Sequence, residues 1–278
     1  MRGLPYHVRS WGDRDAPLLF MLHGWMDVGA SFQFLVDALE REWHVLAPDW
    51  RGFGKSGWCA DGYWFADYIA DLDALLDHFV PDAPARIVGH SLGGNVACIY
   101  AGVRPQRVAQ LVSLEGFGVP AESAELAPDK MAKWLDALRD PPSFAPYANL
   151  AAVADRLQKN NPRMARDKAE FLAQHWAETL PDGSARLLSD PRHKLPFPTV
   201  YRMEEARAAW RRASAPVLWV VAADSFVPRW LGEDAAGLGR RVATFRDGRL
   251  ATIADAGHML HHDQPARVAA AIEPFLAA

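Results

Sequence analysis

Residues 86–97 read RIVGHSLGGNVA and contain the pattern G-x-S-x-G, with Ser91 between Gly89 and Gly93. A short apolar run leads directly into the pattern, and a stretch rich in Ala, Val and Ile that can form a helix follows at once. Glycines beside the serine let the two backbones pass closely, so that the serine sits on a strained bend. The spacing therefore predicts an exposed, nucleophilic Ser91 on a strand-to-helix turn.

Short apolar runs alternate with amphipathic helical segments through the first part of the chain. The clearest helix is predicted over YWFADYIADLDALLDHF at 63–79, where apolar residues recur every three or four positions and aspartates take the other face. This alternation is typical of βαβ units and a mostly parallel sheet. The apolar runs expected to hold its strands are PLLFMLHG at 17–24, HVLAPD at 44–49, ARIVGHS at 85–91 and VAQLVSLEG at 108–116.

After the last of these runs the pattern changes to helical signals separated by proline-rich breaks, with no strand among them. We therefore predict a core made of residues 1–118 and 214–278, interrupted by a helical insertion over 119–213. The strand pattern returns at 216–224, 241–245 and 250–257, before a last helix over 264–277.

Composition limits the class of protein. The chain has 278 residues, 50% of them hydrophobic, which is enough for one large core. A formal net charge of -4 offers no basic field for nucleic acid or an anionic membrane, and no apolar run approaches the length of a membrane span. Two cysteines, Cys59 and Cys98, are too few for a disulfide framework. We expect a cytoplasmic enzyme with a small-molecule substrate, and the sequence does not indicate its oligomeric state.

The stretch LAPDWRGFGKSG at 46–57 resembles a phosphate-binding loop, because Gly52, Gly54 and Gly57 form G-x-G-x-x-G. A dinucleotide loop needs a helix directly after these glycines, whereas the next helix is expected only beyond Gly62. A Walker loop would need a glycine where Asp49 stands. We therefore predict a turn beside a strand and no bound nucleotide or other cofactor.

A serine nucleophile needs a base, and His258 has the best context among the ten histidines. It follows a predicted strand and precedes the last helix, which places it at the same end of the sheet as Ser91. His261 and His262 follow it closely, but no H-E-x-x-H pattern accompanies them. They are interpreted as polar residues at a helix start, and no metal is expected.

Two carboxylates qualify as the acid that orients this histidine. Asp224 and Glu115 each follow an apolar run, and both lie between Ser91 and His258 in the chain. Both are expected at carboxyl ends of strands, where sites in open α/β sheets collect. The sequence favours Asp224 and leaves Glu115 as the alternative.

A tetrahedral oxyanion needs two backbone N–H donors. The amide of Leu92, directly after the serine, is one candidate. The second is expected from the loop His23-Gly24-Trp25-Met26, where Trp25 is the natural donor because Gly24 permits a close approach to the serine.

Together these segments resemble the α/β-hydrolase superfamily, in its epoxide-hydrolase-like and serine-hydrolase-like branch. The resemblance covers nearly the whole chain and rests on HGWMD at 23–27, PDWRGFGKS at 48–56, GHSLGG at 89–94, AADSFVP at 222–228 and AGHMLHHDQP at 256–265. Two departures stand out. Val221 replaces the glycine that usually precedes the acid by three residues, and LEGFG at 114–118 resembles the glutamate loop of haloalkane dehalogenases.

The resemblance implies an α/β-hydrolase fold in which the insertion is a lid, or cap, over the pocket. It implies a carboxylic-ester hydrolase that forms an acyl-serine intermediate and acts on a small to medium apolar acyl or aromatic substrate. The alternatives are a carbon–carbon bond hydrolase of the meta-cleavage-product type and a ligand-binding homologue without activity. The apolar walls of the pocket are expected from Met26, Trp134, Phe171, Trp176 and Met259.

Overall fold

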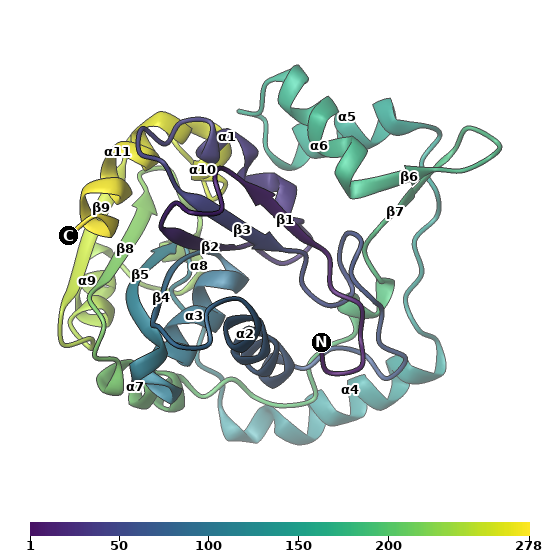
Figure 1. Cartoon of the computed structure of the whole chain (residues 1–278). Helices are drawn as coiled ribbons and strands as arrows, with labels where there is room; N and C mark the ends of the chain where they lie inside the picture. Colours follow the sequence, from purple (N-terminus) through teal and green to yellow (C-terminus); the bar gives the residue numbers. More distant parts are fainter.

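A seven-stranded sheet forms the centre of the computed structural model, in the order β1-β3-β2-β4-β5-β8-β9 (Figure 1). The structure describes residues 1–278, apart from the side chain of residue 235. Strand β1 runs antiparallel to β3, and every other neighbouring pair is parallel, which confirms the predicted α/β class. The strands are β1 (Val8–Trp11), β2 (Leu18–Leu22), β3 (His44–Pro48), β4 (Ala85–His90), β5 (Val108–Leu114), β8 (Val217–Ala222) and β9 (Gly248–Ile253).

Helices cover both faces of this sheet, and a buried apolar cluster lies under each layer. One face carries α2 (Phe65–Phe79), α3 (Leu92–Val103), α7 (Met203–Arg212) and α9 (Ala235–Val242), and the other carries α1 (Gln33–Val36), α10 (Leu260–Asp263) and α11 (Pro265–Leu276). The short α8 (Val227–Trp230) follows β8. None of the described helices is both long and apolar enough to cross a bilayer.

The segment between β5 and β8, here called the insertion, is residues 115–216. It contains α4 (Ala127–Arg139), α5 (Leu150–Asn160), α6 (Arg166–Trp176) and the antiparallel strands β6 (Ala177–Thr179) and β7 (Ala185–Leu187). The expectation that it holds no strand was wrong, because the turn Pro181-Asp182-Gly183 closes a short hairpin that has no long apolar run. Helices α5 and α6 share a third apolar cluster, whereas α4 lies apart from them along the lower edge in Figure 1 and buries no residue.

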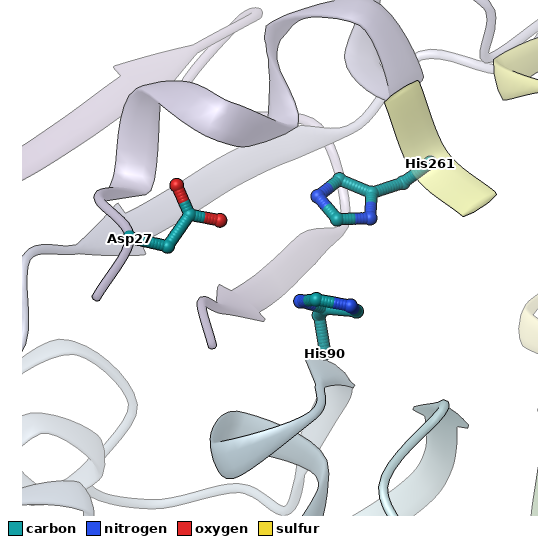
Figure 2. Close-up of side chains that lie close together, drawn as sticks. All are labelled: Asp27, His90 and His261. Carbon is teal, nitrogen blue, oxygen red and sulfur yellow. The ribbon is translucent and has the colours of Figure 1, made fainter. Parts of the chain in front are cut away.

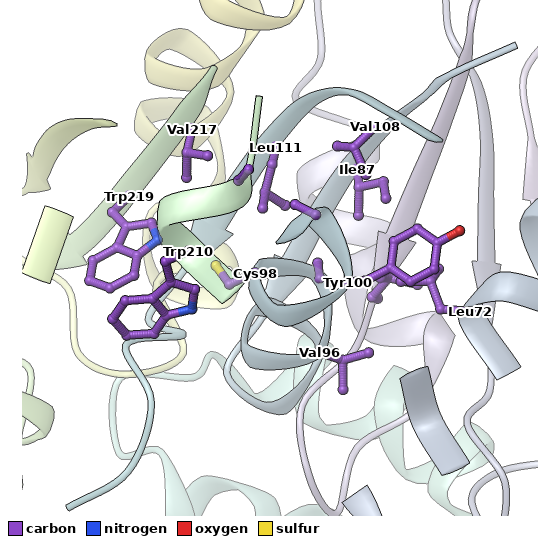
Figure 3. Close-up of a cluster of buried hydrophobic side chains, with 14 of the residues drawn as sticks. Leu72, Ile87, Val96, Cys98, Tyr100, Val108, Leu111, Trp210, Val217 and Trp219 are labelled. Atoms are coloured by element: carbon purple, nitrogen blue, oxygen red, sulfur yellow. The ribbon is translucent and has the colours of Figure 1, made fainter. Parts of the chain in front are cut away.

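Helix α7 packs on the core rather than on the rest of the insertion (Figure 3). Trp210 is almost fully buried and meets Trp219 of β8 edge to face, with ring centroids 5.2 Å apart. Met203 and Ala206 belong to the same cluster. We therefore propose that the cap ends near residue 201 and not at 213.

The strand expected over residues 241–245 is instead the end of α9 and the turn after it. Leu238, Val242 and Phe245 are all buried and follow one another at spacings of four and three, which is the period of a helix face. The short run RVATF is too brief for its strand-like composition to outweigh this packing.

The placement of α7 predicts different stabilities for two tryptophan substitutions. Trp210→Ala should lower the free energy of unfolding by about 3–5 kcal/mol, because it removes a buried ring between β8 and α7. Trp134→Ala, in the half-buried contact of α4 with Trp64, should cost only about 1 kcal/mol. Urea unfolding followed by far-UV circular dichroism measures both, and equal losses would contradict the division proposed here.

Candidate active site

Ser91 lies on a tight turn between β4 and α3, with φ 49° and ψ −110°. Its amide donates to the carbonyl oxygen of Leu114 at 2.8 Å, which fixes the turn to the end of β5. A Cβ at Gly89 would come within 2.5 Å of the backbone of Gly93, and a Cβ at Gly93 would overlap the carbonyl oxygen of Leu22. The two glycines therefore allow the strand, the turn and the helix to cross closely.

The turn lies where the strand order of the sheet reverses. The chain passes from β2 to β3 on one side and then to β4 on the other side of β2. Loops that leave the carboxyl ends of β2 and β4 therefore diverge there, which is where open α/β sheets place their sites. A Cβ on Gly24, after β2, would lie only 3.3 Å from the Cβ of Ser91.

A chain of two hydrogen bonds links Ser91, His258 and Glu115. The His258 Nε2 atom lies 3.1 Å from the Ser91 Oγ atom, and the His258 Nδ1 atom lies 3.1 Å from a carboxylate oxygen of Glu115. A carboxylate only accepts, so Nδ1 donates to it and the lone pair of Nε2 faces the serine hydroxyl. This arrangement allows the imidazole to take the proton of Ser91.

The Glu115 carboxylate is fully buried and accepts hydrogen bonds from three groups. Its Oε1 atom accepts from the amide of Ala222 at 2.7 Å, and Oε2 accepts from the Ser225 hydroxyl as well as from His258. Glu115 has a positive φ of 58°, and its amide donates to the carbonyl of Val220. A buried charge needs such partners, and they leave the carboxylate one orientation.

Asp224 lies elsewhere, so the preference for Asp224 over Glu115 is corrected. Its carboxylate pairs with the Arg163 guanidinium of the insertion at 2.7 Å, and both side chains are about half exposed. The amide of Ala222, at the end of β8, donates a hydrogen bond to Glu115, which holds the Glu115 carboxylate next to the imidazole. Asp224 comes two residues later and points to the insertion. Two features of the sequence pointed to Glu115: the segment LEGFG at 114–118, and Val221 in the place of the usual glycine.

His23 orients the loop that passes next to Ser91. Its Nε2 atom accepts from the amide of Trp50 at 2.8 Å, so its Nδ1 atom donates to the Gly24 carbonyl at 2.7 Å. Burial lowers the pKa of His23 to about 4, which keeps the ring neutral at pH 7. In a trans peptide the N–H points opposite to the carbonyl, so the Trp25 N–H points away from His23.

The two candidate oxyanion donors, the amides of Leu92 and Trp25, have different surroundings. Leu92 is the first residue of α3, where a backbone N–H has no partner within the helix. The Trp25 side chain is nearly half exposed and lies under Lys194 of the insertion, with the ammonium 4.1 Å from the ring centroid. The insertion therefore touches the loop that carries one of the two candidate amides.

The five residues expected to line the pocket lie in different parts of the structure. Met26 has a positive φ of 57° in the loop after β2, and Met259 directly follows His258. The Trp176 indole donates to the Asp27 carboxylate at 3.2 Å, and Phe171 packs on Phe34. Trp134 of α4 meets Trp64, with ring centroids 6.0 Å apart.

Two further residues touch the catalytic candidates and were not expected from the sequence. Phe226 is 57% exposed, and its ring centroid lies 5.1 Å from that of His258. Ser225 donates to Glu115. Both lie in the segment AADSFVP, but no pattern in the sequence indicates which side chain of this segment faces the histidine.

A second group of polar side chains is buried behind this site. Asp27, His90 and His261 offer ligand atoms that all lie within 4.8 Å of one another, and Figure 2 shows them converging from three segments. Ser31 links the group, because its hydroxyl lies 2.7 Å from Asp27 and 3.2 Å from the Nε2 atom of His261. His262 also contacts Ser31, so His261 and His262 do more than begin a helix.

The glycine-rich stretch at 46–57 forms a turn around Asp49. The Asp49 carboxylate accepts from the amides of Gly29 at 2.7 Å and Lys55 at 3.0 Å, and a Cβ on Gly54 would overlap it. The loop therefore encloses a carboxylate of its own chain at the place where a phosphate-binding loop would need room for an anion.

The chain belongs to the alpha/beta hydrolase fold family, whose model matches residues 17–265. It is 25% identical to the serine hydrolase-like protein of Danio rerio over 96% of this chain and 83% of that protein. It is 31% identical to the bifunctional esterase/perhydrolase of Acinetobacter calcoaceticus over 47% of this chain and 48% of that protein. A solved hypothetical protein from Pseudomonas aeruginosa PAO1 matches with a TM-score of 0.88 and 25% identity, covering 100% of this chain and 98% of that one. These matches confirm the resemblance.

The contact between His258 and Glu115 predicts a downfield, exchange-protected imidazole N–H signal in the proton NMR spectrum. Glu115→Gln should remove or shift this signal strongly, because a neutral amide replaces the carboxylate that accepts from Nδ1. Asp224→Asn should leave it in place, because Asp224 pairs with Arg163. Loss of the signal in Asp224→Asn alone would contradict the geometry described here.

Proposed function

We propose that this α/β hydrolase is a serine esterase that cleaves carboxylic esters through an acyl-serine intermediate. The observation that carries the proposal is the hydrogen-bonded chain from Ser91 through His258 to the buried Glu115. An esterase among the relatives that match part of the chain supports the same reaction class. The substrate is a small molecule.

In the proposed reaction His258 takes the proton of Ser91 while the Ser91 Oγ atom attacks the ester carbonyl carbon. Glu115 stabilises the imidazolium that forms, and the amides of Trp25 and Leu92 hold the negative oxygen. The carbon–oxygen bond of the ester then breaks, and His258 gives its proton to the leaving alcohol. Water, deprotonated by His258, attacks the acyl-serine and releases the acid and Ser91.

We propose that Met26, Met259 and Phe226 form the apolar wall next to the reacting atoms. Met26 directly follows Trp25 in the chain, and Met259 directly follows His258. The exposed ring of Phe226 lies near the imidazole. These side chains suit a small to medium apolar acyl group or an aromatic ring. Phe171, Trp176 and Trp134 have packing partners of their own and are assigned to the walls of the cap.

Turnover of a short-chain nitrophenyl ester tests the assignment of roles. Ser91→Ala should lower kcat by about 10⁴-fold or more, and Glu115→Gln by about 10³–10⁴-fold, because the base loses its orientation. Asp224→Asn removes only an exposed ion pair and should change kcat less than about fivefold. Labelling with a fluorophosphonate, located by mass spectrometry, should modify Ser91.

The opposite order of the two acid variants would show that Asp224 is the orienting acid. Labelling of another residue, or full turnover in Ser91→Ala, would refute the serine mechanism itself. A vinylogous diketo acid is the matched second substrate. Its faster turnover by the wild type would assign the site to carbon–carbon bond cleavage instead of ester hydrolysis.

A further inference from the structure

The buried group behind the catalytic candidates contains three ring nitrogens that need a partner. Among the described residues, the Nδ1 atoms of His90, His261 and His262 are shielded from solvent and have no hydrogen-bond partner. Buried polar atoms in folded proteins are almost always paired. We propose that Asp27, His90 and His261 bind one divalent transition-metal ion of the zinc type, and that the bound ion inhibits hydrolysis.

The tautomer of His90 follows from its contacts. Its Nε2 atom lies 2.9 Å from the carbonyl oxygen of His258, and a carbonyl only accepts, so Nε2 carries the proton. The Nδ1 atom is shielded from solvent and has no hydrogen-bond partner among the described residues. It therefore holds a free lone pair. It faces the loop that bears Asp27, because a Cβ on Gly24 would lie 2.9 Å from it.

His261 offers a second lone pair. A neutral imidazole has one unprotonated nitrogen, which can bind a metal ion. The Nε2 atom of His261 lies 3.2 Å from the Ser31 hydroxyl, on the side of the ring that faces Asp27 (Figure 2), so the ion would take this nitrogen and leave the imidazole proton on Nδ1. The ring centroids of His90 and His261 lie 4.4 Å apart, which places the two imidazoles side by side.

Asp27 completes the set with a carboxylate. Its buried side chain is held by Ser31 and by the indole of Trp176, so hydrogen bonds fix its orientation as they do for metal-binding carboxylates. Two imidazoles with one carboxylate suit zinc, copper, nickel or cobalt, whereas magnesium and calcium prefer oxygen ligands. Zinc bonds of about 2.0–2.1 Å bring ligand atoms to roughly 3.3 Å from one another. The present spacing of up to 4.8 Å must therefore shorten by about 1.5 Å when the ion binds.

The site is coupled to the candidate base through His90. The His90 Nε2 atom donates to the backbone of His258, and the two ring centroids lie 4.9 Å apart. A divalent charge there opposes the imidazolium that must form on His258, since like charges disfavour each other. This inhibitory effect rests on the proposed function, whereas the binding of the ion does not.

Equilibrium dialysis of the metal-free, full-length chain against zinc chloride, with elemental analysis, tests the binding. We expect one zinc ion per chain, removed by a chelator, and nothing comparable with magnesium. Asp27→Asn and His261→Gln should each weaken binding by about 10–100-fold. His78→Gln, at an exposed histidine of α2, is the matched control and should bind as the wild type does.

Ester turnover with and without zinc then tests the coupling. Zinc should lower wild-type turnover at least about tenfold and should spare His261→Gln at the same concentration. Equal inhibition of wild type and His261→Gln would place the ion elsewhere and overturn the proposal, as would the absence of binding. If the variants do not fold, the melting temperature of the wild type decides: a rise with zinc supports the site, and no change refutes it. Zinc binding without any ester turnover would refute only the proposed function.

Discussion

The Glu115 carboxylate is the group on which the geometry of this site depends. It is removed from solvent, and a charge in that position is stable only when hydrogen-bond donors surround it. Those donors come from the end of β8, from the loop after β8 and from the loop that carries His258. One side chain directly after β5 thus ties the neighbouring strand and the histidine loop together, and the direction of the imidazole follows from that connection.

Several features were predictable because they depend on local spacing. The helix predicted over 63–79 is observed from Phe65 to Phe79, two residues shorter at its start. It was predictable because its apolar period is regular over four turns. The turn at Ser91 was predictable because its glycines serve a close crossing of backbones within a few residues. The parallel sheet followed from the alternation of strand and helix signals.

Other features depend on contacts between distant parts of the chain. The choice between Glu115 and Asp224 depends on which carboxylate the amide of Ala222 meets, and both follow apolar runs in the sequence. The end of α9 looked like a strand because Val242 and Phe245 suit either structure, and only packing decides between them. The group of Asp27, His90 and His261 joins three segments that no single motif connects.

The contact of Lys194 with Trp25 has a consequence for exchanging parts between related enzymes. His193, the residue before it, is stacked between Phe53 and Tyr63, with ring centroids 3.7 Å and 3.6 Å away. This short piece of the insertion therefore packs on the loops of the central sheet, and its lysine touches the loop that carries the proposed oxyanion donor. A chimera that imports a foreign cap keeps the native loop geometry only if its downstream junction lies before Asp190.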